Sequence, residues 1–199
     1  MAKALSKKLG AEFLGTLSLA LAVTLTLQMR SGLATPLAAG LTLALFVYTI
    51  GGVSGSHINP AVTLGLWSIK KIKTDEAIHY IIAQLIGGAV AIAIGYKLTG
   101  GTPSVQVADS LPIALAEAVG AFTLLFGICS VVYGKVSDAA AGLVVGGSLL
   151  LGITLASAAS NGVLNPAVAL AIGSMSPLYV FAPIVGALLG CQAGKYLFG

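Results

Sequence analysis

Two copies of Asn-Pro-Ala are the residues of this chain whose types and spacing could do chemistry. They lie 106 positions apart, at Asn59-Pro60-Ala61 and at Asn165-Pro166-Ala167. An asparagine oxygen can accept hydrogen bonds from the first free N–H groups of a helix, and proline is favoured at the first helical position. Each copy therefore predicts an extended segment that becomes a helix at the asparagine. The side-chain amide N–H groups are then left free as donors.

Each motif leads into a short apolar segment, over Ala61–Ile69 in the first copy and Ala167–Met175 in the second. These segments are half as long as the roughly 20 residues that a spanning helix needs. Runs of small and polar residues precede the motifs, at Gly51–Ser56 and Ser157–Gly162. Non-helical backbone at membrane depth is tolerated only where it is buried or lines a wet cavity. The pattern predicts two re-entrant half-helices beside one pore.

The motifs belong to an internal repeat. Gly40 and Gly146 keep the offset of 106 in the segments before the two motifs. The segments Ala11–Gly15 and Ala116–Gly120 both begin Ala-Glu and end in Gly, with a slip of one position. We therefore expect one channel domain over residues 1–199, with halves of about 1–98 and 111–199 and a linker over 99–110.

Six apolar stretches predict the helices that position these loops. The chain of 199 residues is 57% hydrophobic and 8% charged, with a mean hydropathy of +1.02, whereas a soluble domain carries about 25% charged residues. The stretches lack the alternation of barrel strands, and a signal-peptide reading of the first is disfavoured by Glu12. We expect an all-α membrane protein with six transmembrane helices, over Leu9–Leu27, Leu37–Val53, Ala77–Gly95, Leu111–Tyr133, Ala139–Ala159 and Pro177–Leu197.

The odd number of spans in each half inverts the second half relative to the first, as in other inverted-repeat membrane proteins. The positive charges support one topology, because most of them fall at the termini or after even-numbered spans. They are Lys3, Lys7, Lys8, Lys70, Lys71, Lys73, Lys135 and Lys195, with Arg30 and Lys97 near the opposite side. By the positive-inside rule we expect a multi-pass protein of the cell membrane with both termini cytoplasmic. The net charge of +4 then reflects topology and not a nucleic-acid partner.

The inverted symmetry predicts that both half-helix N-termini meet at the membrane midplane. Each helix N-terminus carries about half a positive charge, so the opposed pair repels cations and hydronium. Asn59 and Asn165 would supply donors to the pore. A ladder of backbone carbonyl acceptors would come from Gly55, Ser56, His57, Asn161, Gly162 and Val163. This chemistry suits passive passage of small uncharged molecules with exclusion of protons and ions.

Together these features resemble the aquaporins, or major intrinsic proteins, over nearly the whole chain. The resemblance is carried by the paired Asn-Pro-Ala loops and by Ala11–Thr16, Ser54–Gly65, Ala83-Gln84 and Gly87. It implies a channel for water and small neutral solutes in the lipid bilayer, with six spans, two half-helices and one pore in each subunit of a homotetramer. It also implies that Glu12 and Glu117 are buried acceptors that brace the two loops.

One departure from the family concerns the outer constriction. Most aquaporins have an arginine directly after the second motif, where this chain has Val168. The other aligned positions are Ala39, Ile153 and Gly162, where water-selective members usually place an aromatic residue and a histidine. This filter is expected to be wide, apolar and uncharged. Glycerol facilitators usually follow the arginine with aspartate, here Ala169, so a glycerol- or urea-type facilitator with water secondary stays open as an alternative.

Other protein classes fit less well. Secondary transporters also use inverted repeats and broken helices, but neither loop holds an acidic residue for a coupling ion. Gly52–Gly55 matches the motif of intramembrane serine proteases, yet His57 lies in the loop beside it and His79 only at the very start of the next span. We therefore expect no enzyme. Cys129 and Cys191 lack metal-ligand spacing, and no metal or cofactor is expected.

A few residues have two readings. Glu12 and Glu117 are either braces or members of a proton relay, since carboxylates inside membranes are commonly functional. His57 is either a neutral hydrogen-bonding group of the pore wall or a gating switch that titrates near neutral pH. Tyr179 and the other aromatic residues of the last span are interpreted as interfacial or lipid-facing.

Overall fold

The computed structural model describes residues 2–29 and 32–199, and over these ranges it is helical with no strand. Six of its helices are long and apolar enough to cross a membrane. These are α1 (Ala2–Gln28), α2 (Thr35–Ser54), α4 (Thr74–Thr99), α5 (Leu111–Val132), α6 (Asp138–Ala156) and α8 (Pro177–Phe198). Two short helices, α3 (Pro60–Ser68) and α7 (Pro166–Ile172), begin at the two motifs. The prediction of an all-α membrane protein is confirmed.

The ends of several helices differ from the sequence-based expectation, and α1 and α7 show why. Helix α1 begins at Ala2, before the expected Leu9, because the lysine-bearing segment continues the helix beyond the apolar stretch. Helix α7 ends at Ile172 and not at Met175. Gly173 closes it in the left-handed conformation (φ 75°), and its N–H bonds back to the carbonyls of the last turn. Arg30, which was placed near the opposite side, lies outside the described residues.

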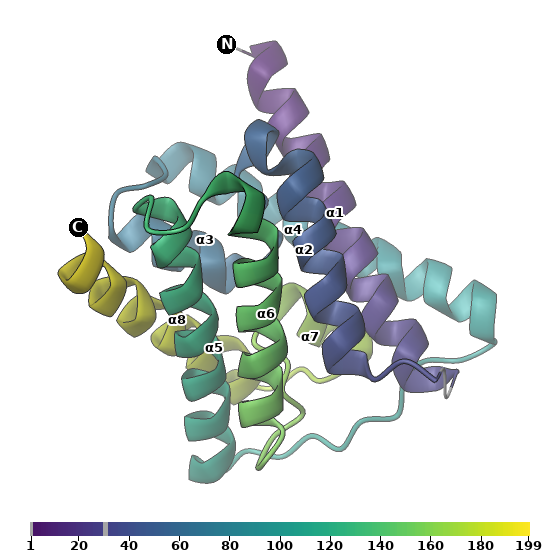
Figure 1. Cartoon of the computed structure of the whole chain (residues 1–199). Coiled ribbons are helices and arrows are strands. Elements are labelled where there is room, and N and C mark those ends of the chain that lie inside the picture. Colours follow the sequence, from purple (N-terminus) through teal and green to yellow (C-terminus); the bar gives the residue numbers. More distant parts are fainter. Residues whose placement is uncertain (1, 30–31) are drawn as a thin grey trace.

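The long helices pack in pairs, α1 against α4, α5 against α8 and α2 against α6 (Figure 1). Helices α2 and α6 touch at Gly40 and Gly146, the two glycines that share the repeat offset. A Cβ atom on Gly40 would lie 2.7 Å from the carbonyl oxygen of Gly146, and one on Gly146 would collide with the carbonyl of Gly40. The two halves therefore meet backbone to backbone at equivalent positions.

Several contacts bring the two ends of the chain to one side of the molecule. Near the N-terminus, Lys8 Nζ lies 2.6 Å from Glu76 Oε1 at the start of α4. Lys71 Nζ lies 4.2 Å from the ring centre of Tyr133 at the end of α5, and Tyr133 is also close to Gly199. The linker between α4 and α5 runs along the bottom of Figure 1, with both termini above it.

Candidate functional site

The two motifs form capped helix starts. Asn59 has an extended backbone (φ −160°), and its side-chain oxygen accepts a hydrogen bond from the N–H of Ala61 at 2.8 Å. Asn165 does the same for the N–H of Ala167 at 3.0 Å, and its oxygen lies 3.4 Å from the N–H of Val168. A proline follows each asparagine at the first helical position. The local geometry is the one that the motif predicts.

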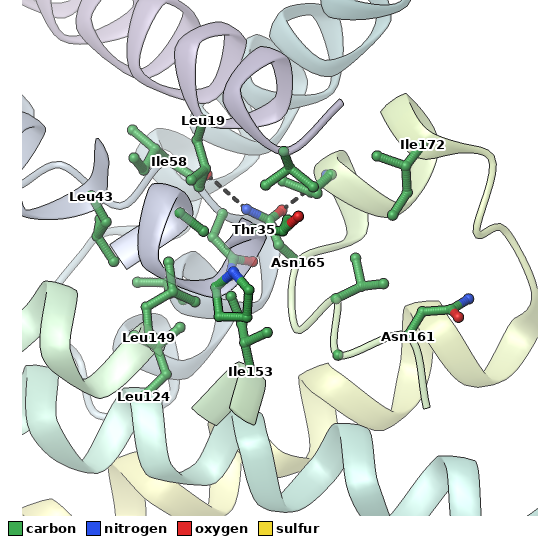
Figure 2. A pocket seen from close by; sticks show the side chains of 18 of the residues that line it. Leu19, Thr35, Leu43, Ile58, Leu124, Leu149, Ile153, Asn161, Asn165 and Ile172 are labelled. Atoms are coloured by element: carbon green, nitrogen blue, oxygen red, sulfur yellow. Dashed lines mark hydrogen bonds between the residues drawn. The ribbon is translucent and has the colours of Figure 1, made fainter. Parts of the chain in front are cut away.

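The tips of the two half-helices meet and exchange hydrogen bonds. Asn59 Nδ2 donates to the carbonyl of Leu164 at 3.0 Å, and Asn165 Nδ2 donates to the carbonyl of Ile58 at 3.0 Å. The second of these bonds is drawn in Figure 2. The expectation that both amide groups are wholly free was therefore wrong. One N–H of each is bound by the opposite loop, which leaves each nitrogen a second N–H.

The residues before the asparagines have a strained backbone. Ile58 (φ 40°) and Leu164 (φ 56°) both lie in the left-handed region, which is unfavourable for side chains with a Cβ and worst for branched ones. Such a conformation costs about 1–3 kcal/mol and persists only where the surroundings enforce it. Both side chains are fully buried. The carbonyls of these same two residues accept the crossed asparagine bonds, so the strain turns each carbonyl towards the other loop.

Two buried glutamates hold the strained segments. Glu12 accepts from the N–H of His57 at 3.0 Å and from the N–H of Ile58 at 2.6 Å. Its remaining bonds come from Ser54 Oγ at 2.6 Å and Gln84 Nε2 at 2.8 Å. Each carboxylate oxygen thus accepts two hydrogen bonds. The first loop is tied to α1 and α4 through this one side chain.

Glu117 repeats the arrangement in the second half. It accepts from the N–H of Val163 at 3.0 Å and from the N–H of Leu164 at 2.8 Å. Ser160 Oγ donates to it at 2.8 Å, as Ser54 does to Glu12. Both glutamates have no exposed surface. Each glutamate thus accepts from two consecutive loop N–H groups of its own half.

The first half carries a polar network for which we find no counterpart among the described contacts of the second. Gln84 Nε2, besides binding Glu12, donates to Thr63 Oγ1 at 2.9 Å. Thr63 Oγ1 lies 3.1 Å from Nδ1 of His57 and donates to the carbonyl of Asn59 at 3.2 Å. The network fixes the His57 ring beside the motif. Thr63 was missed in the sequence because nothing marks it apart from its place one turn after Asn59.

Two buried tyrosines form hydrogen bonds to the backbone of the loops. Tyr80 donates its hydroxyl to the carbonyl of Ser54 at 2.7 Å, and the hydroxyl of Tyr179 accepts from the N–H of Asn161 at 3.0 Å. Tyr179 was interpreted as interfacial or lipid-facing. It is 1% exposed, so the lipid-facing interpretation was wrong. An aromatic residue in an apolar span gives no signal in one sequence of whether it faces lipid or a polar loop.

A cavity of about 230 Å³ opens on one side of the motifs. Figure 2 shows part of its wall, with Leu43, Leu124 and Leu149 at one side, Ile172 and Asn161 at the other, and Asn165 between them. We call this the outer cavity. It is lined by the four expected constriction residues, Ala39, Ile153, Gly162 and Val168. It is also lined by the two asparagines, Asn59 and Asn165, and by the loop residues His57, Asn161 and Val163. None of the described residues that line it is charged.

A second cavity, of about 400 Å³, lies on the other side of the motifs. Gly55, Ser56 and His57 line it, and Lys8, Lys71 and Glu76 stand at its mouth, on the side of the chain termini. His57 and Val62 line both cavities. The structure therefore has two hollows that approach each other at the motifs, from opposite sides of the molecule.

Gly162 is confined in the wall of the outer cavity. It has a left-handed backbone (φ 62°), and a Cβ there would lie 2.9 Å from the carbonyl oxygen of Ile153. Val168 follows the second motif and is 3% exposed. Val168 thus stands where family resemblance expects an arginine, and it brings no charge and no hydrogen-bond donor from its side chain.

The protease-like Ser54 has a different partner from the one catalysis would need. Its hydroxyl donates to Glu12, while Nδ1 of His57 pairs with Thr63. Within the described ranges, no group of three or more His, Cys, Asp or Glu residues could hold a metal ion. Ser54 and His57 are thus held by other partners and do not form a catalytic pair with each other.

Comparisons with known proteins agree with this geometry. Residues 2–194 match the family model described as Major intrinsic protein. The chain is 32% identical over 243 residues to Aquaporin AqpM of Methanothermobacter marburgensis, covering 97% of this chain and 98% of that one. It is 37% identical over 212 residues to Glycerol uptake facilitator protein-like 6 of Lactiplantibacillus plantarum, covering 96% and 98%. The X-ray structure of the aquaglyceroporin from Plasmodium falciparum is similar with a TM-score of 0.79 at 26% identity, covering 97% of both chains.

Proposed function

Because this chain belongs to the major intrinsic protein family and is a passive channel for water and small solutes, we propose that its pore admits uncharged solutes such as glycerol and urea beside water. The observation that carries this proposal is the outer cavity, where Ala39, Ile153, Gly162 and Val168 line the passage without a charge. A filter of this kind excludes solutes by their size and by the cost of removing their hydration water, and not by the pattern of hydrogen bonds that they form.

The size of the lining groups supports passage of solutes larger than water. Ala39 and Gly162 contribute a methyl group and a hydrogen atom where bulky side chains would narrow the path. Stripping water at an apolar ring costs free energy because the lost hydrogen bonds are not replaced. That cost is modest where the ring is wide enough to stay wet. Backbone carbonyls of the loops, and the second N–H of Asn59 and Asn165, then serve as partners deeper in the pore.

The same pore is proposed to exclude ions. The N-termini of α3 and α7 face each other through the crossed asparagine bonds, and their partial positive charges oppose a cation there. An ion entering the outer cavity would also lose hydration against a wall that offers few polar groups. Glu12 and Glu117 hold the loops that create this barrier. Because every one of their carboxylate oxygens accepts at least one hydrogen bond from a loop N–H, they are proposed as braces and not as a proton relay.

The second candidate is a solute facilitator that passes glycerol or urea in preference to water. The apolar outer cavity favours it, since carbon-bearing faces of a solute can contact Leu43, Leu124 and Leu149. A secondary transporter is the candidate from another class. Flux that does not saturate and needs no ion gradient supports the channel and contradicts the transporter.

The placement in the membrane is also a proposal. We propose that residues 1–199 form one channel domain of two halves and that both termini are cytoplasmic, because the lysines of the α3–α4 loop lie on the side of the termini. We further propose a homotetramer in the cell membrane, by resemblance to the family. The mass of the purified protein–detergent complex, measured by light scattering, tests the tetramer.

The decisive experiment is a stopped-flow comparison of water, glycerol and urea entry into liposomes that contain the purified protein. We expect all three fluxes to exceed those of protein-free liposomes. Ala39→Trp fills the outer cavity and should abolish all three. Leu41→Trp is the matched control, since Leu41 is on the same helix but 56% exposed on its outer face. If only water passes, the proposal of a wide filter is wrong.

A further inference from the structure

Trp67, near the end of α3, stands between two hollows on the outer surface. One hollow, of about 720 Å³, is bounded by Trp67, Ser68, Lys70, Ile72, Lys73 and Thr74. The other, of about 160 Å³, is bounded by Leu64, Trp67, Thr74, Ala77, Ile78 and Ile81. Trp67 and Thr74 belong to both, and the indole Nε1 donates to Thr74 Oγ1 at 3.0 Å. This hydrogen bond orients the indole ring, which separates the two hollows.

The two hollows differ in chemistry. The larger hollow is bounded by Lys70 and Lys73, which are both exposed. Neither lysine forms an ion pair, because the only ion pair among the described residues joins Lys8 and Glu76. Asp75, in the first turn of α4, is the carboxylate nearest in sequence to Lys73. The smaller hollow has only aliphatic side chains and the two shared residues, and Ile78 is 54% exposed beside it.

We propose that the two hollows together hold one anionic phospholipid from the leaflet on the side of the chain termini. The phosphate lies between Lys70 and Lys73, and one acyl chain lies along Ile78 and Ile81 past the edge of Trp67. Charge complementarity selects an anionic lipid, because each lysine near the surface attracts a negatively charged headgroup. Tryptophan is also favoured at the level of the headgroups. The inference rests on the membrane placement of the chain and not on which solutes it conducts.

The second half shows that the site is not a general property of the fold. The loop after α7, residues 173–176, is Gly-Ser-Met-Ser and carries no lysine. Ser176 Oγ donates there to Asp109 Oδ1 at 2.6 Å, so that surface carries a carboxylate instead. The proposed lipid site therefore belongs to one leaflet only.

Trp67 provides the test, because it is the only tryptophan of the chain. The full-length protein is reconstituted in zwitterionic vesicles that contain a small fraction of acyl-chain-brominated lipid, either phosphatidylglycerol or phosphatidylcholine. Bromine quenches indole fluorescence on contact. We expect brominated phosphatidylglycerol to bind about tenfold more tightly than brominated phosphatidylcholine, the scale of two lysine contacts reduced by salt.

Lys70→Gln/Lys73→Gln should remove this preference while quenching by both lipids continues at the lower level. Lys135→Gln is the matched control, because Lys135 is exposed on the α5–α6 loop outside both hollows and should keep the preference. Water flux of the double variant, unchanged from the parent, shows that it is folded. Equal quenching by the two lipids in the parent overturns the proposal. Absence of quenching by either lipid also overturns it, since a protein surface such as a second copy then covers Trp67.

Discussion

Two residues, Ile58 and Leu164, place the strained backbone on which the centre of the pore depends. Each turns its carbonyl towards the asparagine of the other loop and its N–H towards a glutamate of its own half. The cost of the left-handed backbone is offset because these groups would otherwise lack partners at membrane depth. The internal repeat therefore includes the left-handed backbone conformation, which both halves adopt at the residue before the asparagine.

The brace can be tested by removing acceptor capacity without changing size. In Glu12→Gln one oxygen becomes an NH₂ group, which faces two buried donors that then lack an acceptor. Each such donor costs about 1–3 kcal/mol, so we expect a clearly lower melting temperature in detergent and reduced water flux. Glu76→Gln is the control for the melting temperature, because its partly exposed ion pair with Lys8 contributes about 0–1 kcal/mol. Equal melting temperatures for the two variants would show that Glu12 does not stabilise the loop.

The uncharged filter can be tested at Val168. Val168→Arg introduces a cation into the wall of the outer cavity, which Gly162 also lines, and narrows that cavity. We expect glycerol and urea flux to fall on the order of tenfold, equivalent to about 1.4 kcal/mol of added barrier, and water flux to fall less. Val168→Met adds volume without charge and separates the two effects. An arginine variant that conducts all three as the parent does would show that Val168 does not line the constriction.

At the scale of the helices, the contact between α2 and α6 fixes how the halves meet. Gly146→Ala places a methyl group against the carbonyl of Gly40, and small-to-large changes in packed sites cost about 1–3 kcal/mol. Gly147→Ala is the neighbouring control, since a Cβ there meets no atom within 4 Å. We expect a lower melting temperature for the first variant and little change for the second. The opposite order would mean that the close helix crossing is not what these glycines provide.

The helices themselves could largely be predicted from the sequence, since an apolar stretch of sufficient length has few alternatives in lipid. Their ends could not. Hydropathy stops at the last apolar residue, whereas α1 continues through its lysines to Ala2. The end of α7 depends on the conformation of Gly173, which composition does not encode.

For the site, sequence reasoning picked out both motifs and both glutamates, and the four residues that it assigns to a constriction line one cavity. It failed where a role depends on a partner far along the chain. Thr63 acquires its role from Gln84 and His57, and Tyr179 from Asn161. The amides of Asn59 and Asn165 are partly consumed by each other's loops, which can be seen only once the two halves are placed together.

For the whole molecule, the opposed half-helices predict that protons remain excluded although the filter carries no arginine. Two helix N-termini, each with about half a positive charge, oppose a hydronium ion at the centre. After a pH jump, liposomes that show high water flux should acidify at about the rate of protein-free liposomes. We expect only a small excess in that rate, because the arginine charge is missing from the filter. Proton entry as fast as that through an ionophore would disprove the barrier. The same liposomes, assayed for water, are the internal control.

The exchange of hydrogen bonds between the loops also bears on how the chain is made. While the ribosome has delivered only the first half, Asn59 has no carbonyl from Leu164 to bind, and the carbonyl of Ile58 has no donor from Asn165. Polar backbone without partners is expensive in hydrocarbon, so the first loop cannot settle at the membrane centre by itself. We therefore expect a nascent chain to hold no finished water path, and the membrane to stay sealed until synthesis passes the second motif.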